Sequence, residues 1–154
     1  MIVTGGGTGG HLFPGIAVAD GVLARCPGSE ILFVGTDRHI DHRTLASRPY
    51  KRASIACGGL KGKGAGARLQ TLAQLPLSLW QAAAMIRRFK PLVVLGVGGY
   101  VTGPVVLAAR LMGIATCIHE QNSVPGLANR LLGRIVDRVF LSIPGSESYF
   151  PAGK

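Results

Sequence analysis

The chain opens with the stretch that decides its fold, Ile2-Val3-Thr4-Gly5-Gly6-Gly7-Thr8-Gly9-Gly10-His11-Leu12-Phe13-Pro14. Its first three residues are typical of a strand, and glycine fills five of the next six positions, so backbone N–H groups can approach a ligand without a Cβ in the way. Pro14 suits the first turn of a helix, and a helix N-terminus attracts phosphate because its N–H groups are free. His11 is of a residue type that exchanges protons at about pH 7. The stretch therefore predicts a phosphate-binding turn with a base beside it.

Beyond this turn, strand-like and helix-like segments alternate along the chain. We expect strands at residues 1–4, 30–34, 52–56, 92–97, 115–119 and 136–142. We expect helices at residues 14–25, 37–47, 68–89, 101–112 and 124–134, with Thr102 and Ser123 as candidate N-caps and a kink or break at Pro76. The alternation predicts an α/β fold with a Rossmann-like, doubly wound parallel sheet. Ligands of such sheets bind at the carboxyl ends of the strands, where the turns 5–11, 96–102 and 119–123 should meet.

The net charge of +10 is concentrated in the middle of this chain of 154 residues, whose length predicts one domain. Eight lysines and arginines and no acidic residue occur from Lys51 to Lys90. Such a stretch indicates an anionic partner, and nucleic acid, acidic lipid and a diphosphate substrate all fit, the alternative being a solvated basic face. An apolar group in the same stretch either faces the core or rests on anionic lipid, and it comprises Leu75, Leu77, Leu79 and Trp80.

Two further patterns are weaker. The glycines of Gly5-x-Gly7-x-x-Gly10 satisfy the dinucleotide fingerprint, but no acidic residue stands clearly at the end of the second strand, so NAD binding is a lesser alternative. Residues 37–42 hold two aspartates together with His39 and His42, which could be drawn as a metal site. Such a group is more often a set of polar surface residues, so we expect no metal and no cofactor.

Four motifs, in this order, together resemble the MurG family. They are Gly6-Gly7-Thr8-Gly9-Gly10-His11-Leu12-Phe13-Pro14-Gly15-Ile16-Ala17, Gly59-Leu60-Lys61-Gly62-Lys63-Gly64, Gly98-Gly99-Tyr100-Val101-Thr102-Gly103-Pro104, and His119-Glu120-Gln121-Asn122-Ser123-Val124-Pro125-Gly126-Leu127-Ala128-Asn129. The members are UDP-N-acetylglucosamine transferases that complete lipid II in bacterial cell-wall synthesis. Two positions depart from the family pattern, Asp41 in place of glutamate and Lys61 in place of arginine, and lysine lacks arginine's bidentate fork for phosphate.

The resemblance implies a GT-B glycosyltransferase, in which two Rossmann-like domains face a cleft. Residues 1–154 would be its N-terminal, acceptor-side domain, and the C-terminal donor-binding domain would be absent from this chain. The isolated chain should then have negligible activity. The resemblance also implies a peripheral location on the cytoplasmic face of the bacterial inner membrane, contact with anionic lipid there, and no nucleic-acid partner.

The implied reaction is attack of a lipid I hydroxyl on the anomeric carbon of UDP-N-acetylglucosamine, with inversion. It needs a general base within hydrogen-bond reach of the hydroxyl. His11 is the first candidate, and Glu120 is either a rival base or a partner that raises the basicity of a histidine. By resemblance, the donor sugar is reached by Thr8, Gly9, Gly10 and Asn122. The acceptor side is lined by Gly99, Tyr100 and Asn129, and its diphosphate would lie on one of the two glycine turns.

Two alternatives from other classes stay open. One is a GT-B transferase that acts on another glycolipid or a natural product, which would share the glycine turn but would not be expected to match the motif at residues 119–129. The other is a nonenzymatic half that binds the acceptor or the membrane and works only with a separate catalytic chain.

Overall fold

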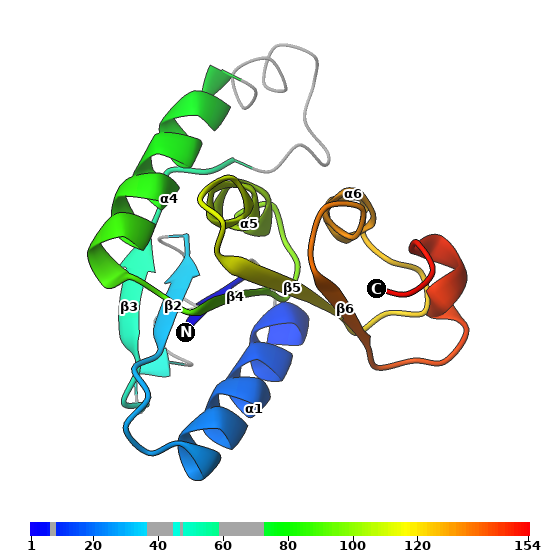
Figure 1. Cartoon of the computed structure of the whole chain (residues 1–154), viewed down its shortest axis with the longest axis horizontal. Helices are drawn as coiled ribbons and strands as arrows, with labels where there is room; N and C mark the ends of the chain where they lie inside the picture. Colours follow the sequence, from blue (N-terminus) through cyan, green and yellow to red (C-terminus); the bar gives the residue numbers. More distant parts are fainter. Residues whose placement is uncertain (7–8, 37–44, 47, 59–72) are drawn as a thin grey trace.

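The protein, seen here as a computed structural model that describes residues 1–6, 9–36, 45–46, 48–58 and 73–154, is built on one parallel sheet (Figure 1). Its strands are β1 (Ile2–Thr4), β2 (Leu32–Gly35), β3 (Lys51–Ser54), β4 (Val93–Gly96), β5 (Ala115–Glu120) and β6 (Arg138–Leu141). They are arranged in the order β3-β2-β1-β4-β5-β6, and every pair is parallel. This is the strand order of a Rossmann fold, and the predicted fold class is confirmed.

Helices cover both faces of the sheet. α1 (Gly9–Arg25) lies on one face, while α4 (Leu75–Phe89), α5 (Thr102–Leu111) and α6 (Leu127–Leu132) lie on the other (Figure 1). A short 3₁₀ helix, η1 (Ser146–Tyr149), follows β6. Each helix that connects two parallel strands must cross over the sheet, and these crossovers bring the carboxyl ends of all six strands to one edge.

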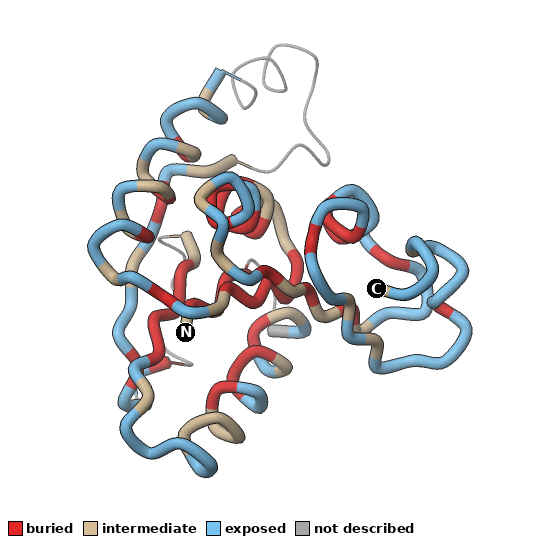
Figure 2. Tube along the Cα trace, in the orientation of Figure 1, coloured by how far each residue is buried: buried red, intermediate tan, exposed pale blue. Residues whose placement is uncertain are grey.

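The strands are buried on both sides, which explains their nearly continuous apolar sequences. Successive side chains point to opposite faces. In β2, Leu32 and Val34 therefore pack under the α4–α6 layer, while Phe33 packs against the α1 side. Figure 2 shows buried residues concentrated along the central strands and on the inner sides of the helices.

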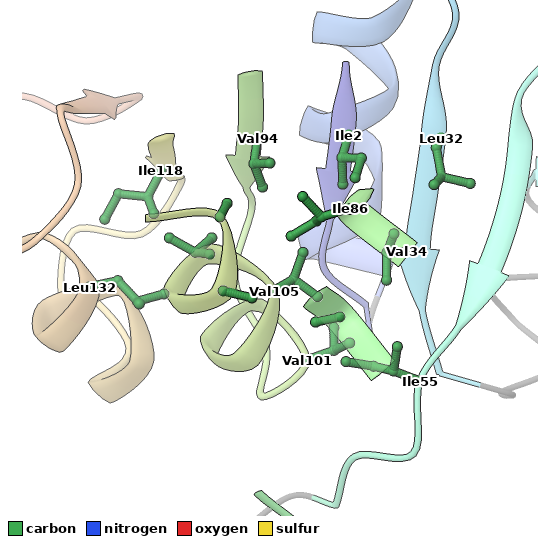
Figure 3. Packing of buried hydrophobic residues seen from close by; sticks show 14 of the residues in the cluster. Ile2, Leu32, Val34, Ile55, Ile86, Val94, Val101, Val105, Ile118 and Leu132 are labelled. Carbon is green, nitrogen blue, oxygen red and sulfur yellow. The ribbon is translucent and has the colours of Figure 1, made fainter. Parts of the chain in front are cut away.

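The larger of the two cores lies between the sheet and the α4–α6 layer. Figure 3 shows Ile2 and Val94 of the central strands facing Ile86 of α4 and Val105 of α5, and these four side chains are at most 1% exposed. β-branched residues dominate this core because they pack well on a pleated surface. The packing places α5 over β4 and β5, with its first residue, Thr102, beside the ends of β1 and β4, where the turns of the predicted site begin.

The start of α1 differs from the prediction. The helix begins at Gly9 instead of Pro14, so His11 lies in its first turn and Pro14 lies inside it. Proline has no N–H for the carbonyl of Gly10 four residues earlier. Gly10 is exposed, so water can replace this bond, which is why a proline is tolerated there.

Both predicted N-caps are wrong. The N-cap positions of α5 and α6 are Val101 and Gly126, and neither helix has a side-chain cap. Pro76 lies in the first turn of α4, where its missing N–H costs nothing. Several predictions fall outside the described residues, namely the helix at 37–47 apart from its end, the first part of the helix at 68–89, Thr8, the His39 and His42 pair, and the motif at 59–64.

Candidate active site

The two glycine turns meet where the strand order reverses. β1 lies between β2 and β4, so the turns that follow β1 and β4 flank the crevice in which such folds bind ligands. A Cβ on Gly99 would lie 2.5 Å from the carbonyl oxygen of Gly6, and Gly99 has φ +85°. Only glycine combines this backbone conformation with so close an approach. The glycines therefore let the two turns pack backbone against backbone.

Thr102 ties these turns together from beneath. Its buried hydroxyl lies 3.1 Å from the carbonyl oxygen of Thr4, at the end of β1, and 2.8 Å from that of Gly98, after β4. One hydroxyl thus links the first residues of α5 to both strands of the switch point. Thr102, predicted as a helix N-cap, thus contacts the ends of β1 and β4 through its hydroxyl instead.

His11 projects from the first turn of α1 toward this crevice. A Cβ on Gly98 would lie 2.7 Å from its Nδ1, and Gly98 has φ +105°, so the imidazole lies directly against a position that requires glycine. The same Nδ1 is hydrogen-bonded to the Nε2 of Gln121, which follows β5. The turns after β1, β4 and β5 therefore converge on the predicted base.

Glu120 has a different environment. The residue is 1% exposed, and its two carboxylate oxygens accept hydrogen bonds from the turn that leads into α6 and from α6 itself. Oε1 accepts from the backbone N–H and the Nδ2 of Asn122, at 2.9 and 2.8 Å. Oε2 accepts from the backbone N–H of Gly126 at 3.3 Å and from the Nδ2 of Asn129 at 2.9 Å. Four donors from this chain thus surround the carboxylate.

The other predicted site residues divide into two groups. Gly9 and Gly10 are the first two residues of α1, and Gly99 lies in the turn after β4. Tyr100 follows Gly99 and is partly buried, and its carbonyl accepts from the thiol of Cys57 at 3.5 Å. Asn122 and Asn129 instead belong to the Glu120 network. Asn129 is 2% exposed, and its Nδ2 also donates to the carbonyl of His119 at 3.2 Å.

His119 lies one residue before Glu120, at the end of β5. Its Nε2 is 2.8 Å from the Oγ of Ser142, and its Nδ1 is buried without a partner. Burial lowers the pKa of this imidazole, and the neighbouring charge of Glu120 acts in the opposite direction. The lowered pKa favours the neutral form of the His119 side chain.

The sequence placed Gln121 in a motif of polar residues but gave it no role of its own beside His11. The period of a strand gives the signal that could have found it. Ile118 packs under the α4–α6 layer, and Cys117 packs on the α1 side. Continued past the end of β5, this alternation brings Gln121 to the α1 side, where His11 lies.

The apolar group at the start of α4 is exposed. Leu75, Leu77 and Trp80 are 43, 47 and 65% exposed, while Leu79 packs against the core. Arg87 and Arg88 lie exposed in the last turn of the same helix. The structure thus shows a surface patch, in place of a helix that faces the core with all four residues. Within the residues that the structure describes, no helix is long and apolar enough to cross a membrane.

The geometry agrees with what comparison with known proteins shows. The family model described as the glycosyltransferase family 28 N-terminal domain matches residues 1–141. The chain belongs to this family. The residues matched by the glycosyltransferase family 28 N-terminal domain include both glycine turns and the motif that contains Glu120.

Two relatives that are similar to this chain carry one name. The UDP-N-acetylglucosamine--N-acetylmuramyl-(pentapeptide) pyrophosphoryl-undecaprenol N-acetylglucosamine transferase of Geobacter sp. (strain M21) is 53% identical over 151 residues, which are 98% of this chain and 41% of the relative. The protein of the same name from Citrifermentans bemidjiense is 54% identical over 151 residues, 98% of this chain and 42% of the relative.

A solved structure supports the same placement within family 28. The crystal structure of Acinetobacter baumannii MurG superposes with a TM-score of 0.85 at 33% identity, over 99% of this chain and 43% of that chain. The resemblance to the MurG family is confirmed. This family 28 domain spans 41–43% of the length of these relatives.

Proposed function

We propose that this chain is the acceptor-side half of an inverting glycosyltransferase. The whole enzyme would transfer N-acetylglucosamine from UDP-N-acetylglucosamine to lipid I and so form lipid II. The observation that carries the proposal is the position of His11, which is held at the switch-point crevice between two glycine turns. The names of the relatives supply the donor and acceptor, and the donor-binding domain would lie in the part of the relatives that this chain does not span.

The proposed chemistry uses His11 as the general base. The acceptor hydroxyl oxygen forms a bond to the anomeric carbon while the bond from that carbon to the UDP oxygen breaks. UDP leaves with the electron pair, and the hydroxyl proton passes to His11. Backbone N–H groups at the start of α1 and in the turn at 98–102 would hold the acceptor diphosphate, because such groups attract phosphate. Gly9 and Gly10 at the start of α1, and Gly99 and Tyr100 after β4, would line the acceptor side.

Glu120 and its partners would act from behind the crevice. Its four hydrogen bonds occupy the carboxylate with donors from the same chain, which favours an organising role for Glu120 over the role of base. Asn129 would act through Glu120, since it is buried against it. Asn122 is exposed, so it can reach the donor sugar while Glu120 fixes its orientation.

The exposed patch on α4 would bring the enzyme to the membrane that holds its lipid acceptor. Leu75, Leu77 and Trp80 supply apolar area, and Arg87 and Arg88 supply positive charge for anionic headgroups. The location would be the cytoplasmic face of the bacterial inner membrane. The attachment would be peripheral.

The test is turnover of an enzyme that joins this chain to the remaining length of its relatives, with UDP-N-acetylglucosamine and a soluble lipid I analogue. His11→Ala should lower kcat by roughly 10²–10⁴-fold, the range for a lost acid–base group, and Cys26→Ala, at an exposed position, should leave it unchanged. A wild-type rate for His11→Ala removes His11 from the base role. No transfer to the lipid I analogue by the unmodified enzyme would overturn the proposal itself.

A further inference from the structure

One contact at the crevice has no assigned role. The Nδ1 of His11 is hydrogen-bonded to the side-chain amide of Gln121, although the two residues lie on α1 and after β5. Both residues are partly buried. Gly98 lies against the same ring, since a Cβ there would be 2.7 Å from Nδ1 and 2.9 Å from Cε1. The ring is therefore held by an amide at one nitrogen and by glycine backbone beside it.

This contact decides which ring nitrogen carries the proton. A neutral imidazole has one N–H and one acceptor nitrogen. If Gln121 donates through Nε2, then Nδ1 of His11 must be the acceptor, and Nε2 of the ring must carry the hydrogen. If Gln121 accepts through Oε1, then Nδ1 carries the hydrogen and Nε2 of the ring keeps a lone pair. Only the second arrangement gives a base.

The second arrangement needs only a 180° rotation of the amide group. The oxygen and nitrogen of a glutamine amide have nearly the same shape, so their assignment follows from the hydrogen-bond network. With Nε2 placed toward His11, the Oε1 of Gln121 is buried without any partner. Rotation gives Oε1 a donor, the N–H at Nδ1, and puts the amide nitrogen in the buried position. Each orientation of the amide leaves one buried atom of Gln121 without a partner, Oε1 in the first and the nitrogen in the second. The count of hydrogen bonds therefore does not decide between them, and the requirement that His11 act as a base favours the second.

We propose that Gln121 is a positioning residue that accepts a hydrogen bond from Nδ1–H of His11 and so leaves the Nε2 of His11 free to take the acceptor's proton. The proposal rests on the proposed function for its purpose, but the tautomer itself is a property of this chain alone. Gly98 contributes as well, because its lack of a side chain lets the His11 ring lie where the amide of Gln121 can reach it.

The test is the tautomer of His11, measured by ¹⁵N NMR of the imidazole nitrogens in the 154-residue chain. The measurement is made at about pH 8.5, where unperturbed imidazoles are neutral, and His11→Asn assigns the signals. We expect a protonated Nδ1 in the wild-type chain. Gln121→Glu should keep this tautomer because a carboxylate can only accept, whereas Gln121→Met should give a mixture. Gln81→Met removes an amide that accepts from the N–H of Ala56 at 2.8 Å, and it should leave His11 unchanged.

The proposal is overturned if the wild-type chain has its proton on Nε2, or if Gln121→Met keeps the wild-type tautomer. Should Gln121→Met fail to fold, the comparison of wild type with Gln121→Glu still decides, because a different tautomer in the two means that Gln121 donates.

A second readout uses the longer enzyme of the proposed function. Gln121→Met should lower kcat by about 10–100-fold, taking the range measured for lost hydrogen-bond partners of metal-ligating histidines as a guide, with KM for the donor unchanged. Gln121→Glu should restore most of the activity. Failure of the glycosyltransferase proposal would remove these rates and leave the NMR result intact, so the two failures are distinguishable.

Discussion

Glu120 and Asn129, one at the end of β5 and the other inside α6, are joined by a 2.9 Å hydrogen bond between two buried side chains. The carboxylate accepts three further hydrogen bonds from Asn122 and Gly126. It therefore holds the strand, the turn and the helix in one arrangement. The same bond places Asn129 against the carboxylate and away from open solvent.

Replacing Glu120 with glutamine should destabilise the chain. The new amide nitrogen would face N–H donors, and hydrogen bonds to a charged group contribute about 1.5–3 kcal/mol each. We expect Glu120→Gln to lower the free energy of unfolding by about 2–4 kcal/mol in a urea titration. The control is Glu147→Gln, whose carboxylate is exposed and accepts from the N–H of Gly145, and it should cost less than about 0.5 kcal/mol. Equal losses in both variants would contradict the organising role.

Three glycine-to-alanine variants separate steric overlap from backbone strain. Gly99→Ala adds a Cβ that would lie 2.5 Å from the Gly6 carbonyl oxygen at φ +85°. Gly113→Ala has φ +73° with open space around it, and Gly103→Ala, inside α5, has open space and no such backbone strain. We expect losses of unfolding free energy of about 3 kcal/mol or more, about 1–2 kcal/mol and none, respectively.

The measurement is the urea midpoint of each variant. Gly103→Ala should be neutral or slightly stabilising, because alanine is the better helix former. If Gly99→Ala loses no more than Gly113→Ala, the two glycine turns do not pack as closely as described.

Two buried threonines offer a matched pair. Both Thr4 and Thr102 are fully buried, but only Thr102 uses its hydroxyl, since the Oγ1 of Thr4 has no partner. Thr102→Val should lower the free energy of unfolding by about 1–2 kcal/mol. Thr4→Val should be neutral or stabilising, because it removes an unpaired polar atom from a strand. Thermal unfolding of the two variants checks this, and a larger loss for Thr4→Val would refute it.

We expect the chain to lose stability at alkaline pH because of the buried phenol of Tyr50. Burial and a hydrogen bond to Asp20 raise the pKa of its phenol to about 12, while the unfolded chain has a phenol pKa of about 10. Ionisation therefore begins in the unfolded state first, so this contribution is fully present below about pH 10 and is lost as the pH rises toward about 12. The midpoint of urea unfolding, measured from pH 8 upward, should fall more for wild type than for Tyr50→Phe.

Tyr149→Phe serves as the control for this pH dependence. Tyr149 is exposed, and the guanidinium of Arg130 lies over its ring, a contact that phenylalanine can keep. The urea midpoint of Tyr149→Phe should change with pH as that of the wild type does. Identical curves for Tyr50→Phe and wild type would mean that the phenol of Tyr50 does not contribute.

The fold could be predicted because its signals are local. The apolar run around β4 and the glycine turn after β1 each indicate their structure without knowledge of their neighbours. The beginning of α1 could not be predicted in this way. Gly9 and Gly10 are poor helix formers, but tertiary packing overrides this low helix propensity. The prediction of Thr102 as an N-cap was wrong because of tertiary contacts too. Its hydroxyl bonds to the carbonyl oxygens of Thr4 and Gly98 and not to the start of its own helix.

The site was predictable as a set of turns but not as a set of contacts. His11 and the glycines at 98–99 are visible as unusual residues at strand ends. The sequence also makes Glu120 conspicuous, since no other acidic residue lies between it and Asp41. Whether such a carboxylate is a base or a structural acceptor depends on its burial and its donors. The partner of His11 is 110 residues away in the chain, and local patterns do not report such a pairing.

The parallel pairing of β1 with β4 also has a consequence for how the protein folds. Thr4 pairs with Gly96, so most of the first hundred residues must be looped out before these strands can join. Closing so long a loop costs entropy before any contact repays it. β1 with β2 and β4 with β5 are the shorter closures, and we expect each half of the sheet to form before the halves meet. The crevice that holds His11 would then come into being with the last step of folding.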